Sequence, residues 1–168
     1  MEKIFSKIDE IHARLMSAVE PVDVETFSRR PSENVWSLAE ILHHLSMVEQ
    51  SVLKALQKEI KAPPQRVGLR GRLMPLRLLV GTRLVRIKAP KFVEPTDAPQ
   101  KAEAMANFNR VREELKEFAQ KHGRERLLNL VFKHPVLGPI SGLGALSFVS
   151  NHERRHFKQV REIIEKLK

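Results

Sequence analysis

The C-terminal part of the chain has the apolar spacing of one long amphipathic helix. Its inward positions recur at alternating intervals of three and four residues, which is the period of a helix that packs in a bundle. The stripe consists of Ala145, Val149, His152, His156, Val160, Ile163 and Leu167. Because His152 and His156 are four residues apart, both imidazoles project from the same face of the helix toward a core.

Two other segments have a similar period. The first runs from about Glu2 to Val19 and is stopped by Pro21. The second runs from about Pro99 to His122, with Gly123 as its stop signal. Both are long enough to be bundle helices.

A further helix has an unusually clear start. Ser37 and Glu40 form the S-x-x-E capping box, and Trp36 and Ile41 are placed to form a hydrophobic staple around it. We expect this helix to reach about Ile60, ahead of two prolines.

Together these patterns predict an all-α fold: a single domain over residues 1–168, built as an up-and-down four-helix bundle. A loop that shows no strand alternation of useful length leads to the last helix, from about Leu143 to Leu167. The positions that we expect to be buried are Ile41, Leu45, Phe108, Leu115, Ala145, Val149, Val160 and Ile163.

The net charge of +10 is concentrated in one segment. Between Lys61 and Lys91 there are nine basic residues and no acidic one. The stretch from Gly71 to Lys88 is helical in character but not cleanly amphipathic. We therefore predict an extra basic helical segment between the second and third bundle helices, as a cap or an oligomer surface. A binding module that uses this segment at a membrane surface or on an anionic partner is an alternative function.

Composition excludes several classes of protein. Aromatic residues are only 5% and tyrosine is absent, so nucleic-acid binding is not expected. No apolar run approaches the ~20 residues of a membrane span. Without cysteine, any metal must be held by His, Asp or Glu, and a cytoplasmic location follows weakly.

The histidines are the candidate site residues. His152 and His156 match H-E-x-x-H, but only twelve residues follow His156, so a third ligand must come from upstream. On the capped helix, His44 lies at the flank of the apolar arc and His43 falls nearly opposite, which makes His44 the better ligand. The alternative is that these histidines are ordinary residues at the edge of the core.

Three other residues are candidates for supporting roles. Glu153, beside His152, is either a base or hydrogen-bond acceptor for a ligand imidazole, or an exposed carboxylate. Glu49 projects into a buried arc and needs an arginine or an imidazole N–H as partner. His134 is a further catalytic candidate if it lines the mouth of the site; the alternative is a turn residue before proline.

Three motifs in this order resemble the DinB-like superfamily over nearly the whole chain. They are the W-S-x-x-E-I-L-x-H-L helix start at Trp36, the His134-Pro135 loop with Gly138, and the terminal H-x-x-x-H followed by Gln159-Val160. The resemblance implies a four-helix bundle in which His44, His152 and His156 bind one divalent metal, Zn or Ni.

The resemblance also implies a function. It suggests a metal-dependent transferase or hydrolase that acts on a small electrophilic substrate, with a low-molecular-weight thiol such as bacillithiol, mycothiol or glutathione as cosubstrate. A homodimer is one expected assembly. The alternative to an enzyme is a four-helix-bundle protein whose metal site is structural or vestigial.

Overall fold

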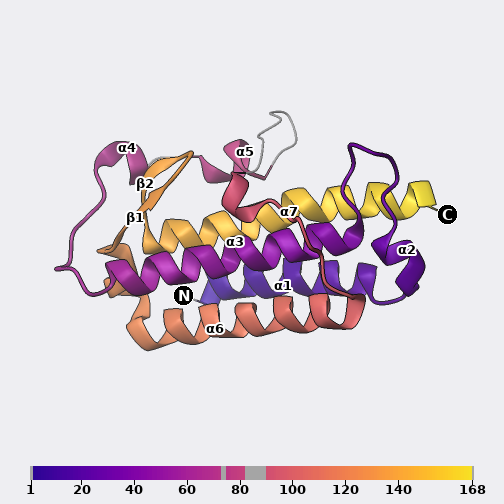
Figure 1. Ribbon diagram of the computed structural model, residues 1–168. Coiled ribbons are helices and arrows are strands. Elements are labelled where there is room, and N and C mark those ends of the chain that lie inside the picture. Colours follow the sequence, from indigo (N-terminus) through magenta and orange to yellow (C-terminus); the bar gives the residue numbers. More distant parts are fainter. Residues whose placement is uncertain (1, 73–74, 82–89, 168) are drawn as a thin grey trace.

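Four long helices lie side by side in the computed structural model of the protein (Figure 1). The structure describes residues 2–72, 75–81 and 90–167. The long helices are α1 (Glu2–Val19), α3 (Leu38–Glu59), α6 (Lys101–Leu128) and α7 (Gly142–Leu167). The predicted four-helix bundle is confirmed.

The directions of the helices differ from the simple up-and-down order. Arg126 at the end of α6 donates a hydrogen bond to the carbonyl of Ile60, which follows α3. Helices α3 and α6 therefore end together and run parallel (Figure 1). Lys7 of α1 is likewise level with Ser150 of α7, whose hydroxyl lies 3.5 Å from the Lys7 carbonyl oxygen. The order is up, down, down, up, because the connection between α3 and α6 returns along the bundle before α6 begins (Figure 1).

The start of α3 is fixed by its capping box. The Ser37 hydroxyl accepts from the Glu40 backbone N–H at 3.2 Å, and the Glu40 carboxylate accepts from the Ser37 N–H at 2.8 Å. Arg30, which follows the short helix α2 (Val24–Ser28), donates from Nε to the same carboxylate at 2.9 Å. This arrangement holds the first turns of α3 in place.

The core consists of two apolar clusters. All eight positions expected to be buried are less than 9% exposed, which confirms the predicted helix faces. One cluster includes Ile8 and Leu115, and the other includes Leu15 and Phe108. Between these levels of the bundle, each long helix contributes one buried or half-buried polar residue, namely His12, Glu49, Arg112 and Glu153.

The segment before α7 contains a β-hairpin where we had expected a loop. Strands β1 (Val131–His134) and β2 (Gly138–Ser141) pair antiparallel, and Phe132 lies buried opposite Ile140. Four-residue strands are too short to give a recognisable alternation. The stop predicted at Gly123 is a kink with a φ of 72°, after which α6 resumes.

Short helices lie against the hairpin, α7 and α3 in the described part of the connection. They are α4 (Leu69–Arg72), α5 (Leu76–Leu79) and the 3-10 turn η1 (Lys91–Val93). Helix α4 contacts β2, and α5 contacts α7. Gly71 packs so closely on the Pro139 carbonyl that a side chain would not fit. The predicted helical cap is confirmed for α4 and α5, while residues 73–74 and 82–88 of the Gly71 to Lys88 prediction lie outside the described residues.

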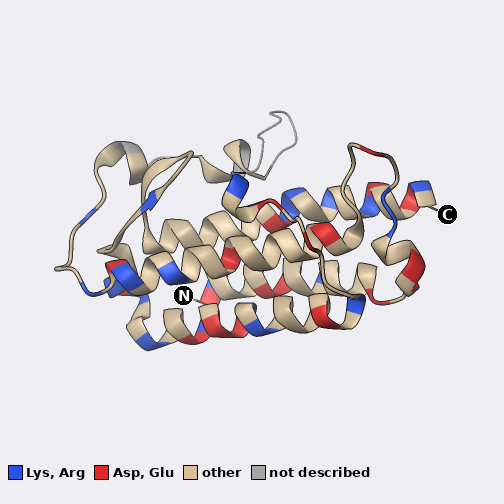
Figure 2. Cartoon of the chain, viewed as in Figure 1, with Lys and Arg blue, Asp and Glu red and all other residues tan. Residues whose placement is uncertain are grey.

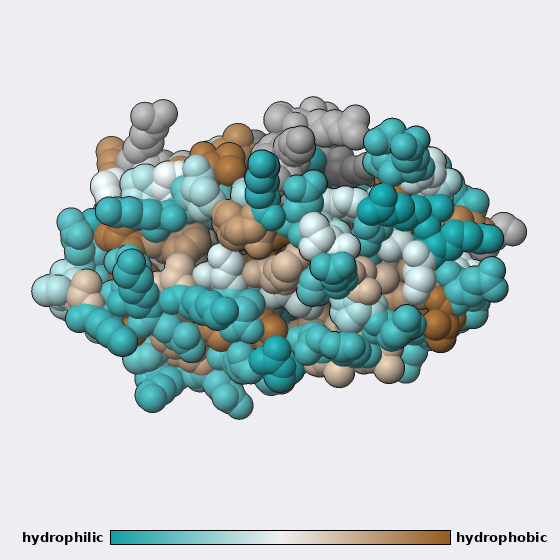
Figure 3. Space-filling model, viewed as in Figure 1, coloured by the Kyte–Doolittle hydropathy of each residue, from teal (hydrophilic) through white to brown (hydrophobic). Residues whose placement is uncertain are grey.

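Charged residues of both signs are interspersed along the outer faces of the helices (Figure 2). The face seen in Figure 3 is mostly hydrophilic. Among the described residues, no helix combines the length and the apolarity needed to cross a bilayer.

Candidate metal centre

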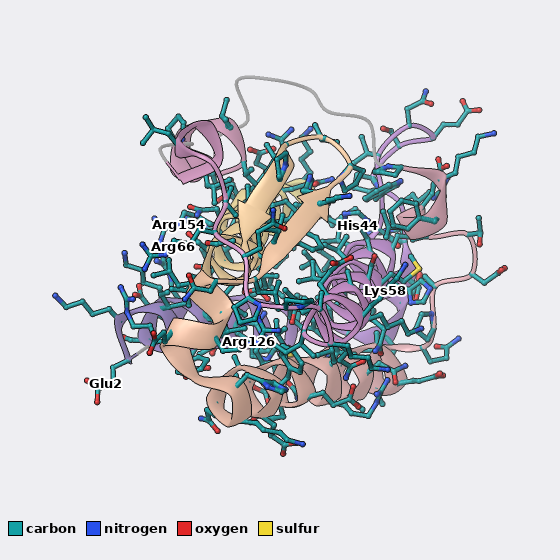
Figure 4. The ribbon with its side chains drawn as sticks, turned by 90° about the vertical axis from the view of Figure 1, so that its left-hand side faces the viewer. Glu2, His44, Lys58, Arg66, Arg126 and Arg154 are labelled. Carbon is teal, nitrogen blue, oxygen red and sulfur yellow. The ribbon has the colours of Figure 1, made fainter. Side chains whose placement is uncertain are left out.

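Three histidines from two antiparallel helices meet on the side of the bundle near the hairpin. His44 of α3 has its Nε2 3.4 Å from Nε2 of His152, and Nε2 of His156 lies 3.2 Å from the same atom. Figure 4, which looks along the bundle, places His44 on the upper side of α3, beside the hairpin. The candidate ligand atoms all lie within 4.8 Å of one another.

The distances suit a small divalent ion. Metal–nitrogen bonds of about 2.0–2.1 Å at the tetrahedral angle separate two ligand nitrogens by roughly 3.3–3.4 Å. Both measured Nε2 separations are close to that edge length. The donor set of three imidazoles fits Zn or Ni and leaves coordination positions for other ligands.

Two of the imidazoles are oriented through their other nitrogen. His44 donates from Nδ1 to the Val93 carbonyl at 2.7 Å, and His156 donates from Nδ1 to the Gln159 side-chain oxygen at 3.1 Å. A proton on Nδ1 leaves the lone pair on Nε2, which faces the site. Sequence reasoning assigned no role to either partner. The role of Gln159 could have been predicted, because it lies three residues after His156 on the same helix. The role of the Val93 carbonyl could not, because no sequence signal marks a backbone carbonyl that far from His44.

Burial keeps two of the three histidines, His44 and His152, neutral. Burial, followed by the charges of His156 and His44, holds the pKa of His152 well below its ordinary value. Burial also lowers the pKa of His44. Neutral imidazole is the form that binds metal, so all of these effects favour ligation.

A cleft of about 840 Å³ opens over the three histidines. Trp36 forms part of its lining, with its ring 5.0 Å from that of His44 and stacked on that of His156 at 6.4 Å. Phe148 lies against His152 on the other side, at 5.4 Å between ring centres. The volume is in the range of small-molecule binding sites.

His134 lines this cleft and also shapes the hairpin turn. Its Nδ1 accepts hydrogen bonds from the backbone N–H groups of Val136 and Leu137, both at 3.1 Å. Burial lowers the pKa of His134 to about 4, so the ring is neutral and carries its proton on Nε2. Both roles weighed for this residue are therefore present, and it offers an N–H donor rather than a base.

Glu49 and Glu153 lie inside the bundle, where they bind an arginine and not a ligand imidazole. Both are 1% exposed and bind the guanidinium of Arg112, and neither lines the cleft. Successive side chains of an α-helix point about 100° apart, so Glu153 points into the bundle while His152 points into the cleft. The arginine partner expected for Glu49 is present. The sequence analysis did not predict a role for Arg112. Its position on the apolar face of α6 could have indicated a buried ion pair.

The remaining histidines lie apart from the cluster. His43 is half-buried and not part of it. His12 bonds through Nε2 to Asn109 at 2.8 Å, and His122 packs on Phe118. The H-E-x-x-H match does not form a zinc-protease site, because its glutamate is turned away and the third histidine comes from α3.

A family model for the DinB superfamily matches residues 7–160. The chain belongs to the DinB superfamily. It is 30% identical over 145 residues to the uncharacterized protein YuaE of Bacillus subtilis strain 168, covering 85% of this chain and 86% of that protein.

Two solved structures share the DinB fold of this chain. TT2238, a four-helix bundle protein, superposes with a TM-score of 0.64 at 20% identity, over 96% of this chain and 98% of TT2238. YfiT from Bacillus subtilis superposes with a TM-score of 0.66 at 14% identity, over 98% of this chain and 85% of YfiT. YfiT is described as a probable metal-dependent hydrolase with an unusual four-helix bundle topology.

Proposed function

We propose that this protein is a metal-dependent enzyme in which His44, His152 and His156 bind one divalent ion, Zn²⁺ or Ni²⁺, and which acts on a small electrophilic substrate. The observation that carries the proposal is the convergence of three imidazoles whose Nε2 atoms lie 3.2 and 3.4 Å apart beneath an open cleft. A divalent ion in such a set lowers the pKa of bound water to about 7 or holds a thiol as thiolate.

Other residues of the cleft position the substrate. The rings of Trp36 and Phe148 border the histidines and limit the access of bulk water. His134 donates from Nε2 to an oxygen of the bound substrate, since its Nδ1 is already occupied by the hairpin turn. Glu153 has no part in proton transfer, because it lies buried against Arg112.

Hydrolysis is the reaction class that we favour, because the structurally similar YfiT is described as a probable metal-dependent hydrolase. In hydrolysis, water adds its oxygen to the electrophilic atom and its proton ends on the leaving group. The second candidate is transfer to a small thiol, whose sulfur bonds to the electrophile while its proton leaves with the displaced group. The resemblance of the histidine motifs to thiol-dependent relatives supports this candidate.

The test is the metal content of protein purified without chelators. We expect about one divalent ion per chain, and loss of most of it in His44→Ala, His152→Ala and His156→Ala. The matched control is His43→Ala, which changes the neighbour of His44 and should keep its metal. Retained metal in His44→Ala contradicts the proposed site. A bound ion with every position filled by protein atoms would make the metal structural.

A further inference from the structure

The lining of the cleft differs on the two sides of the three histidines. Helices α3 and α7 are antiparallel, so the residues after His44 lie opposite those before His152. Among the described residues, and apart from the half-buried Ser51 and His134, the lining on this side is apolar and includes Val48, Val52, Val80, Phe132, Leu137 and Phe148. All of these apolar residues except the half-buried Leu137 are less than 9% exposed. We call this part the apolar end.

The opposite side of the cleft carries charges of both signs. Its lining residues include Arg30, Glu33, Arg155, Glu162 and Lys166. Arg30 already pairs with Glu40, and Glu33 and Lys166 are exposed. We call this part the charged rim. Because it carries charges of both signs, the charged rim selects little between substrates of different net charge. The apolar end, in contrast, favours apolar groups.

The apolar end begins directly at the histidines. The ring of Phe148 stacks on His152 with an interplanar angle of 21°, and the rings of His134 and Phe132 continue the aromatic surface. Val48 and Val52 lie one and two turns beyond His44 along α3, so this surface extends about 6–12 Å from the site at 1.5 Å per residue. An apolar group of a substrate that binds here lies next to the substrate atom that is held at the three histidines.

We propose that the substrate carries an apolar acyl or aryl group directly beside its reactive bond, and that this group occupies the apolar end while the polar remainder faces the charged rim. This inference rests on the proposed function. Burial of each methylene strengthens binding by up to about fourfold, so a longer apolar group should bind more tightly. Hydrophilic substrates of the same reactive class should bind weakly.

The experiment compares alkyl hydroxamates, which bind metals through their head group, on the metal-loaded protein. Trp36 is the only tryptophan of the chain and lines the cleft, so its fluorescence reports occupancy. We expect octanohydroxamate to bind at least tenfold more tightly than acetohydroxamate. Val48→Thr and Leu137→Asn should each reduce this ratio at least threefold. Lys158→Gln, at an exposed position outside the lining of the cleft, should leave the ratio unchanged.

Failure of this inference can be distinguished from failure of the metal site. Equal affinities for the two hydroxamates in metal-loaded protein overturn the inference and leave the metal site intact. The same titration on chelator-treated protein uses octanamide and acetamide, which need no metal. If the protein binds no metal but still prefers octanamide, the apolar end is supported and the proposed metal-dependent function is contradicted. No chain-length preference in either arm overturns the inference.

Discussion

The guanidinium of Arg112 donates from Nε to the carboxylate of Glu49, 3.1 Å away, at the centre of the bundle. It also donates to Glu153 and to the carbonyl of Ile8. Three long helices thus meet α6 at one cation that is 1% exposed. Arg112, Glu49, Glu153 and His12 form a polar layer between the two apolar clusters. Glu153 of this layer directly follows the candidate metal ligand His152 along α7.

Replacing Arg112 by methionine should destabilise the protein strongly. The substitution leaves the buried carboxyl groups of Glu49 and Glu153 without the guanidinium that they bind, and breaking a buried pair in this way costs about 3–5 kcal/mol. The measurement is the free energy of unfolding in urea. Arg110→Met is the control, because Arg110 is 55% exposed and pairs with Glu114 at the surface, where such pairs contribute below ~1 kcal/mol. Equal losses in the two variants would contradict a structural role for the layer.

Stability should fall as the pH rises toward 8. Burial raises the pKa of Glu49 from 4.5 to about 8, with Arg112 opposing the shift and Glu153 adding to it. Between these two values the folded protein holds a proton that the unfolded chain has released, so the free energy of unfolding decreases with pH. The charged and titratable groups around this layer are Asp9 and His12 of α1, Arg112 of α6 and Glu153 of α7.

Glu49→Gln tests this expectation, because the amide keeps hydrogen-bonding atoms and does not titrate. Urea unfolding between pH 5 and pH 8 should show a flatter dependence in the variant than in the wild type. The other groups titrate in both proteins and largely cancel in the comparison. Parallel curves would show that Glu49 stays ionised in the fold.

Phe108→Ala should cost about 3–5 kcal/mol of stability, through the lost burial of the ring and the cavity left behind. Phe108 is fully buried, and its ring packs on His12 and lies near Arg112. Phe92→Ala is the control, since that ring is 63% exposed and its loss should change stability by less than ~0.5 kcal/mol. Chemical unfolding of both variants provides the comparison.

Much of the fold could be predicted from the sequence, because helical periodicity identifies buried faces directly. The capping box at Ser37 located the start of α3, and the projection of α3 separated His44 from His43. Periodicity carries no information on the direction in which helices pack. The parallel arrangement of α3 and α6 depends on the length of the connection between them, and the sequence pattern gave only the helices themselves.

The misses have physical causes as well. Helix projection indicated that Glu49 is buried but not which helix supplies its partner, because that depends on tertiary contacts. Glu153 was weighed beside His152 by proximity in sequence, although adjacent helical residues face different ways. The hydrogen bond from His44 to Val93 joins segments 49 residues apart. The homodimer, the cytoplasmic location and the single domain over residues 1–168 stay predictions.

Gln159 should set the affinity of the metal centre although it is not a ligand. Its side-chain oxygen accepts from Nδ1 of His156 at 3.1 Å, which directs Nε2 of that ring into the site. Loss of such a partner typically weakens metal affinity by about 10–100-fold. We expect this loss in Gln159→Leu, measured by competition with a chromophoric chelator, whereas Gln159→Glu, which keeps an acceptor, should retain most of the affinity. Lys158→Leu, at the exposed neighbouring position, should bind metal as the wild type does. Unchanged affinity in Gln159→Leu would mean that the other contacts of the His156 ring, including its stacking on Trp36, are sufficient to orient it.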